Sequence, residues 1–324
     1  LLGNGPNSTG GKAQLLSIDL FSGSVKSTAM SSVSANGLSA VRAWDNDGNG
    51  ITDTVYAGDL QGNLWKVTEL ASLNPTVQKL FQAVDSSGNS QPITSSPLAG
   101  RSPFTQRVWL FFGTGQYLNT SDLADTSVQT WYGINDDGST ATVSRSADLL
   151  ERKILQDVPV SPDVSARVIE SGAREDLVGK RGWYIDLLPN GSPPGVGERM
   201  VTPNQFQGSA LIGNTRIPDA SDPCAPSGRG FIMSIDPFTG ARLVETFFDI
   251  NEDDAFNSGD LVEVDGELVV VSGLGLNTGF SNPSFLKEKM YIPTDDGNVS
   301  VLDINPFSTG ASRTSWRELL NTGN

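Results

Sequence analysis

Short apolar runs separated by glycine-rich and Asp- or Asn-containing turns extend along the whole chain. Runs of this length, bounded by turn residues, are typical of β-strands. The pattern therefore predicts an all-β protein. The clearest strand-like runs lie at residues 107–112, 128–134, 182–187, 209–214 and 267–271.

Two stretches repeat a pattern of strand, glycine turn and strand, one at residues 54–67 and the other at residues 290–300. Glycine supplies the positive φ that a tight hairpin requires. A strand that ends in Asp or Asn, followed by a Phe-containing turn and a glycine, occurs at residues 15–23 and 232–240 and, with one insertion, at 301–310. Hairpins that recur along a chain are typical of β-propeller blades. A β-sandwich whose strands merely look alike is the alternative.

Two segments interrupt this pattern, near residues 139–181 and 251–260. In the first, Ser146 is a candidate N-cap and apolar residues follow at helical spacing, so we predict a short inserted helix over residues 146–155. The second contains the acidic run at residues 252–254, which we interpret as a solvated loop, with a second cation site as the less favoured alternative. We predict one propeller domain over residues 1–324, with both segments as insertions.

The composition excludes several classes of function. Asp and Glu total 37 against 22 Lys and Arg, which gives a formal net charge of −15 and argues against nucleic acid as a partner. The chain has no His, which removes Ser-His-Asp and Cys-His catalysis and His-ligated metal sites. No apolar run is long enough to span a membrane. Cys224 is the single Cys and cannot form an internal disulfide.

The clearest candidate chemistry is the run Asp-Asn-Asp-Gly-Asn-Gly-Ile-Thr-Asp at residues 45–53. Asp45, Asp47, Asn49 and Asp53 stand at the side-chain offsets of a calcium loop, and the backbone carbonyl of Ile51 stands at the intervening offset.

Ca²⁺ takes six to eight oxygen ligands in irregular geometry, whereas Mg²⁺ prefers a tighter octahedron. Three carboxylates on one short turn repel one another unless a cation neutralises them. Tyr56 occupies the position at which an EF-hand has its closing Glu, so we predict a Ca²⁺ loop between two strands. A surface turn without metal is the alternative.

Several stretches, in order along the chain, together resemble the C-terminal domain of the type IV pilus proteins called PilY, or PilC in some pathogens. The resemblance implies a modified β-propeller, which we expect to have seven blades, and a Ca²⁺ ion held by Asp45, Asp47, Asn49, the Ile51 carbonyl and Asp53. It also implies that the chain is the C-terminal part of a longer protein. The matching pieces are residues 45–53 running into 56–66, 112–117 with 129–134, 182–187 with 197–201, and 222–224 before 230–240.

The resemblance implies a non-enzymatic role in pilus biogenesis, in calcium-dependent control of pilus extension and retraction, and in adhesion. The expected partners are pilus components (pilins, minor pilins or secretin) and host or abiotic surfaces. The expected location is extracellular, on the pilus or the outer-membrane surface.

Three other functions are alternatives to this role. A quinoprotein-like propeller enzyme shares the Gly-Asn-Leu-Trp pattern of residues 62–65, but a single Cys cannot form the vicinal disulfide usual in that class. The others are a carbohydrate-binding calcium propeller and a carboxylate-based glycosidase. No pair of acidic residues stands out from those that form turns.

Overall fold

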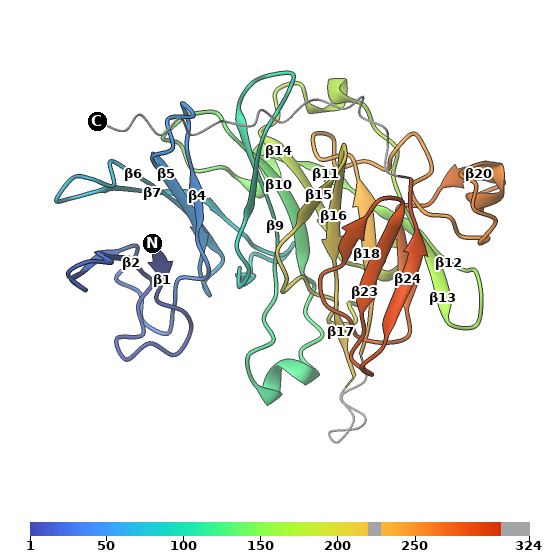
Figure 1. Cartoon of the computed structure of the whole chain (residues 1–324), viewed down its shortest axis with the longest axis horizontal. Helices are drawn as coiled ribbons and strands as arrows, with labels where there is room; N and C mark the ends of the chain where they lie inside the picture. Colours follow the sequence, from blue (N-terminus) through green and yellow to red (C-terminus); the bar gives the residue numbers. More distant parts are fainter. Residues whose placement is uncertain (220–227, 306–324) are drawn as a thin grey trace, which may run out of the picture.

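The computed structural model describes residues 1–219 and 228–305 of the chain, and these residues form many strands with only short helical turns. Their strands make six sheets, and Figure 1 shows the N-terminal sheet at the left, β20 at the right, and β23 and β24 between them. The all-β prediction is confirmed.

The first two sheets are antiparallel meanders in chain order, whereas the third has the order β11-β14-β10-β9-β8 and pairs β11 in parallel with β14. The first contains β1 (Leu2–Gly3), β2 (Gln14–Ile18) and β3 (Val25–Ala29). The second contains β4 (Arg42–Trp44), β5 (Thr54–Gly58), β6 (Asn63–Thr68) and β7 (Thr76–Gln82). The third contains β8 (Leu98–Arg101), β9 (Val108–Gly113), β10 (Thr130–Asp136), β11 (Leu150–Arg152) and β14 (Gly182–Asp186).

The fourth sheet is the largest and has the order β12-β13-β21-β18-β16-β15, with β17 paired to β18. Its strands are β12 (Ile154–Pro159), β13 (Val164–Ile169), β15 (Gln205–Gln207), β16 (Ala210–Asn214), β17 (Ile217–Pro218), β18 (Gly228–Ile235) and β21 (Gly273–Leu276). The last two sheets contain β19 (Leu261–Val264) with β20 (Glu267–Val270), and β22 (Ser284–Leu286), β23 (Lys289–Pro293) and β24 (Val299–Asp303).

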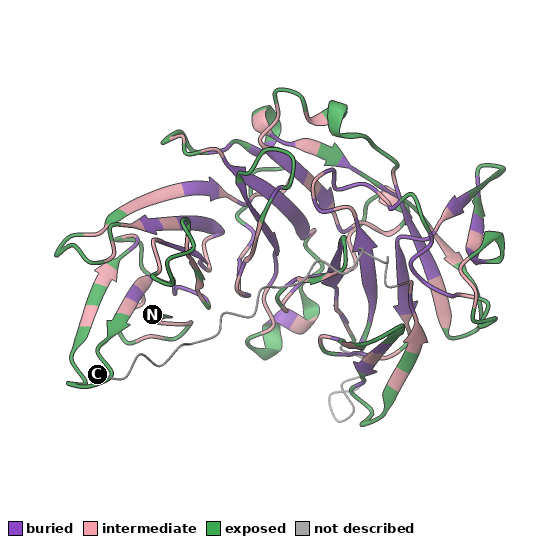
Figure 2. Ribbon diagram, turned by 45° about the horizontal axis from the view of Figure 1, so that its top comes forward, coloured by how far each residue is buried: buried purple, intermediate pink, exposed green. Residues whose placement is uncertain are grey.

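Successive sheets pack face to face, because strands with two buried faces send alternate side chains to different cores. In β5, Val55 and Ala57 join a core shared with the first sheet, while Tyr56 between them joins a core shared with the third sheet. In β9, Leu110 points to that same second core and Phe111 to a core shared with the fourth sheet. The period-two alternation of a strand thus links neighbouring sheets into a stack (Figure 2).

The predicted hairpins are confirmed at β5–β6 and at β23–β24. Gly62 and Gly297 turn these hairpins with φ values of +77° and +87°. In the first hairpin a Cβ on Gly62 would also lie 2.6 Å from the carbonyl oxygen of Gln91, so both the backbone conformation and the packing require glycine.

The predicted helix over residues 146–155 is wrong beyond its first turn. Helix α1 covers only Arg145–Asp148, and its N-cap is Ser144 rather than Ser146. Leu149 packs in the core between the second and third sheets, whereas Ile154 packs in the core between the third and fourth sheets. A helix cannot send its apolar face to both, so the chain extends into β11 and β12 and joins two sheets.

The acidic segment at residues 251–260 is an irregular, largely exposed loop, as predicted, and it ends in the short helix η4 (Ser258–Asp260). Asp249 accepts backbone hydrogen bonds from Glu252 and Asp254, so a carboxylate outside the acidic run orders the loop. Cys224 and the third repeat beyond residue 305 lie outside the described residues. In the part of the chain that is described, no helix is long and apolar enough to cross a bilayer.

Candidate metal centre

The acidic loop at residues 45–53 connects β4 to β5 in the second sheet. Its base is closed by the pairing of Trp44 with Thr54 and by a 3.0 Å hydrogen bond from the Asp53 N–H to the Trp44 carbonyl. The two strands therefore fix both ends of the loop, and the acidic residues project from one end of the sheet.

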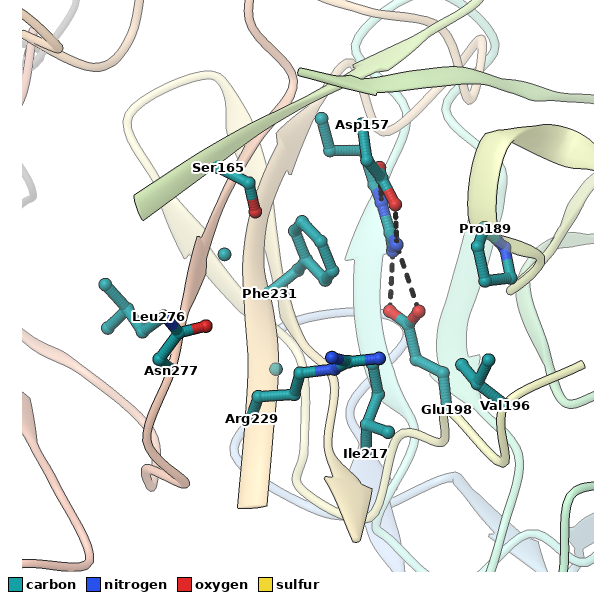
Figure 3. A pocket seen from close by; sticks show the side chains of 13 residues that line it. Asp157, Ser165, Pro189, Val196, Glu198, Ile217, Arg229, Phe231, Leu276 and Asn277 are labelled. Carbon is teal, nitrogen blue, oxygen red and sulfur yellow. Dashed lines mark hydrogen bonds and ion pairs between the residues drawn. The ribbon is translucent and has the colours of Figure 1, made fainter. Parts of the chain in front are cut away.

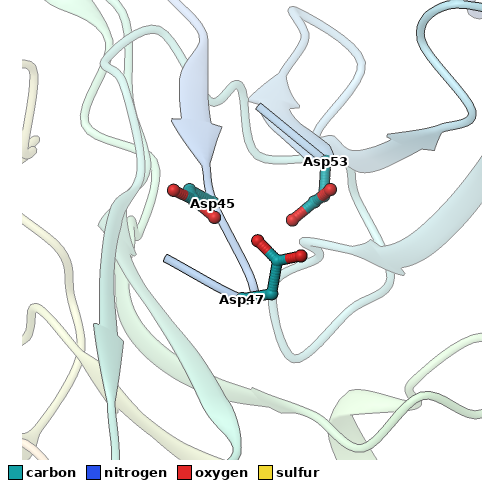
Figure 4. Close-up of side chains that lie close together, drawn as sticks. All are labelled: Asp45, Asp47 and Asp53. Carbon is teal, nitrogen blue, oxygen red and sulfur yellow. The ribbon is translucent and has the colours of Figure 1, made fainter. Parts of the chain in front are cut away.

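The loop brings Asp45, Asp47 and Asp53 together. One carboxylate oxygen from each lies within 4.8 Å of the others, and the three side chains converge on a shared space (Figure 4). Asp45 and Asp53 are partly shielded from solvent, and Asp47 is exposed. This is the only group of three or more acidic or Cys side chains with this spacing among the described residues.

Backbone N–H groups orient the carboxylates. The two oxygens of Asp45 accept hydrogen bonds of 2.7 Å from the N–H groups of Gly48 and Gly50. Asp53 accepts another of 2.7 Å from the Asn46 N–H. Gly48 and Gly50 have φ values of +78° and +86°, so the turn needs glycine for its conformation.

Asn49 and Ile51 lie in the same loop. The Asn49 side-chain oxygen accepts a 2.7 Å hydrogen bond from the Ile51 N–H, and its amide nitrogen donates to Asp47 at 3.0 Å. The Ile51 side chain is 68% exposed, so this residue serves the loop through its backbone rather than through apolar packing.

The electrostatics of the loop keep it anionic. The hydrogen bond from the Gly50 N–H, helped by that from Gly48, holds the pKa of Asp45 below its ordinary value of 3.8 despite some loss of solvation. Asp45 is therefore ionised at neutral and mildly acidic pH. The three converging carboxylates offer only oxygen donors and so fit a hard divalent cation, and the irregular loop suits Ca²⁺ better than Mg²⁺.

Arg101, at the end of β8, connects this loop to the third sheet. Its guanidinium donates to the Asn46 carbonyl at 2.9 Å and to the Gln106 carbonyl at 2.8 Å. Nearby, Arg42 in β4 donates to the Pro97 carbonyl at 3.0 Å. Sequence reasoning missed Arg101 because its loop partner lies 55 residues away and is a backbone carbonyl, which leaves no motif.

Comparison with known proteins places the chain in a family context. A family model described as the PilY1 beta-propeller domain matches residues 2–77 and 67–166. The crystal structure of the Pseudomonas aeruginosa PilY1 C-terminal domain superposes with a TM-score of 0.76 at 27% identity, covering 94% of this chain and 69% of that one. The propeller prediction is confirmed, and the number of blades stays a prediction.

Curated relatives agree with this match. The type IV pilus biogenesis factor PilY1 homolog of Xylella fastidiosa is 42% identical over 99% of this chain and 25% of its own length. The type IV pilus biogenesis factor PilY1 of Pseudomonas aeruginosa is 30% identical over 98% of this chain and 30% of its own length. The chain thus spans between a quarter and a third of these relatives.

Proposed function

The chain belongs to the PilY1 family, and from this premise we propose that it is a non-enzymatic propeller domain of a type IV pilus biogenesis factor that responds to Ca²⁺ at residues 45–53. The names of its relatives support the role in pilus biogenesis. The observation that supports the response to Ca²⁺ is the convergence of three carboxylate oxygens within 4.8 Å.

Asp45, Asp47, Asn49, the Ile51 carbonyl and Asp53 are the proposed ligands. The site has three carboxylates and lacks a closing Glu, so we expect a dissociation constant on the order of micromolar or weaker, in the range of calcium sensors. Only the folded loop assembles these ligands, so bound Ca²⁺ stabilises the ordered loop by a free energy that grows with the logarithm of the Ca²⁺ concentration relative to the dissociation constant.

We propose that this ordering regulates pilus extension and retraction and surface attachment. The proposed partners are pilus components such as pilins, minor pilins or secretin, together with host or abiotic surfaces. The proposed location is outside the cell, on the pilus or at the outer-membrane surface. The formal charge of −15 favours binding of cations and of basic partner surfaces over binding of nucleic acid.

We assign no catalytic role to the chain, and the contacts of two buried carboxylates support this. Glu198 is paired with Arg167, and Asp136 accepts from both Lys66 and the Tyr56 hydroxyl. These groups are held in fixed contacts rather than as a free acid and base. The described Trp residues give no support to a sugar-binding platform, because none of them is exposed. Trp44 is half-buried, and the four buried ones are Trp65, Trp109, Trp131 and Trp183. Trp316 lies outside the described residues.

Asp53→Ala tests this function in the full-length protein, expressed in a piliated cell. Removal of one carboxylate is expected to weaken Ca²⁺ binding roughly 10- to 100-fold, because affinity follows the charge of the ligand set. Surface pili should then be as few as in chelator-treated wild-type cells and should no longer respond to added Ca²⁺. Counting pili by electron microscopy checks this.

The matched control is Asp19→Ala, which removes an exposed carboxylate that also accepts backbone hydrogen bonds but lies outside the loop. This variant should keep the wild-type response to Ca²⁺. An Asp53→Ala strain with normal, Ca²⁺-responsive pili would contradict the proposed regulation.

Arg101→Met is expected to separate ion binding from its effect on the neighbouring sheet. In the wild type, Ca²⁺ should slow hydrogen exchange both in residues 42–58 and in the β8–β9 segment, because Arg101 joins Asn46 to that segment. In the variant, only residues 42–58 should respond. Arg107→Met is the control, since Arg107 lies in the same turn and its guanidinium has no partner among the described residues. Equal protection of β8–β9 in both variants would contradict the role of Arg101.

A further inference from the structure

A hollow of about 200 Å³ lies in the fourth sheet, on the opposite side of the third sheet from the metal loop. Strands β13, β18 and β21 form one side of it, and the segment from Pro189 to Glu198 forms the other (Figure 3). It adjoins a second hollow of about 580 Å³, which shares four of its lining residues: Val196, Ile217, Arg229 and Asn277.

Arg167 lies at the inner end of the first hollow, and all five of its N–H donors are engaged, four by carboxylates and the remaining Nη1 donor by the Met233 sulfur at 3.9 Å. Its Nε and Nη2 donate to the two oxygens of Asp157 at 2.8 and 3.0 Å, and its Nη1 and Nη2 donate to those of Glu198 at 2.5 and 3.0 Å. The guanidinium carbon lies 3.5 Å from the centre of the Phe231 ring. A ligand therefore cannot take Arg167 as its partner without breaking these contacts.

Arg229, in β18, is the charged residue that remains available. It lines both hollows, and its guanidinium has no ion-pair or hydrogen-bond partner among the described residues. Its backbone is fixed by pairing with Ile217 in β17. Figure 3 shows its side chain reaching across the hollow toward the side formed by Ile217 and Glu198. A guanidinium in this position offers two parallel N–H donors, which match a carboxylate.

Around Arg229, the first hollow is lined by five apolar side chains as well as by the charged triad of Asp157, Arg167 and Glu198. Ile217, Phe231 and Leu276 line the first hollow, with Pro189 and Val196 on the opposite side. Two polar side chains, Ser165 and Asn277, stand at its edge (Figure 3). Ligand sites commonly combine such apolar walls with a few polar groups that fix orientation.

We propose that this hollow binds a small carboxylate that carries an apolar group. The carboxylate pairs with Arg229, and the apolar group packs against Ile217, Phe231 and Leu276. A polypeptide C-terminus that ends in an apolar residue and a free organic acid present the same chemistry. The site is independent of the metal loop, because no residue is common to both.

Calorimetric titration of the whole chain with two probes tests this proposal. One probe is N-acetyl-phenylalanine as the free acid, and the other is a five-residue peptide with a C-terminal Phe and a free carboxylate. Saturable binding of either probe, weakened at least about tenfold in Arg229→Gln and when the same probe carries a C-terminal amide, is the expected result. Tighter binding of the peptide identifies a polypeptide end, and equal binding identifies a small acid.

Arg107→Gln is the matched control, since it removes an exposed guanidinium that lines neither hollow. It should bind both probes as the wild type does. Arg229 is exposed, so its variant should keep the wild-type melting temperature. Absence of saturable binding at millimolar concentrations, or binding that is unchanged in Arg229→Gln or with the amide, would overturn the proposal.

Discussion

Replacement of Arg167 with methionine is expected to lower the free energy of unfolding by about 3–5 kcal/mol, because it leaves the buried carboxylate of Glu198 without its cation, along with the partly exposed carboxylate of Asp157. Arg167 is fully buried, and the Glu198 side chain that it pairs with is also inaccessible to solvent. Burial disfavours the charged guanidinium, but the charge of Glu198 and the hydrogen bonds to Asp157 outweigh it and raise the pKa of Arg167. Arg167 therefore stays protonated across the physiological pH range.

Urea denaturation followed by Trp fluorescence measures this loss. The matched control is Arg181→Met, because the Arg181–Asp137 pair is partly exposed, with side chains 15% and 22% accessible. Such a pair contributes only about 0–1 kcal/mol. If Arg167→Met lowers the free energy of unfolding no more than Arg181→Met does, water enters the site freely. The charged triad then does not close the inner end of the hollow to solvent.

Asp59→Asn is expected to lower the free energy of unfolding by roughly 2–4 kcal/mol, since it places an amide where buried donors require an acceptor. Asp59 is fully buried at the start of the β5–β6 turn. One of its oxygens accepts from the Asn36 amide at 2.9 Å and the Trp65 indole at 2.8 Å, and both oxygens accept from Asn63.

Asp85→Asn supplies the control for this substitution. Asp85 opens a turn of the same Asp-x-x-Gly-Asn sequence and accepts from the backbone and side chain of Asn89, but the turn faces solvent. The Asp85→Asn substitution should lower the free energy of unfolding by no more than about 1 kcal/mol. Equal destabilisation of the two variants in thermal and urea unfolding would mean that the turn sequence, rather than the burial of Asp59, sets the stability.

The features predicted correctly from the sequence are those that a short stretch of chain determines. The β5–β6 hairpin follows from two strand runs and one glycine at the turn. The convergence of Asp45, Asp47 and Asp53 follows from their alternate spacing on one loop whose ends are joined by neighbouring strands.

The features that were missed depend on distant parts of the chain. The apolar spacing over residues 146–155 suits a helix, yet Leu149 and Ile154 belong to different cores, which only the stacking of sheets reveals. Arg167 meets Glu198 31 residues away, and Arg101 meets Asn46 across two sheets. No local pattern marks such an arginine, because its partner can be any carboxylate or carbonyl that the fold brings near.

The most direct test of the proposed calcium response is a calorimetric Ca²⁺ titration of chelator-treated protein, with Mg²⁺ as competitor, for the wild type, Asp45→Ala and Asp19→Ala. We expect one saturable site in the wild type and in Asp19→Ala, with a dissociation constant on the order of micromolar or weaker and little competition from Mg²⁺. Asp45→Ala should bind Ca²⁺ roughly 10- to 100-fold more weakly while remaining folded. Absence of binding in a folded wild-type protein, or undiminished binding in Asp45→Ala, would contradict a Ca²⁺ site at residues 45–53.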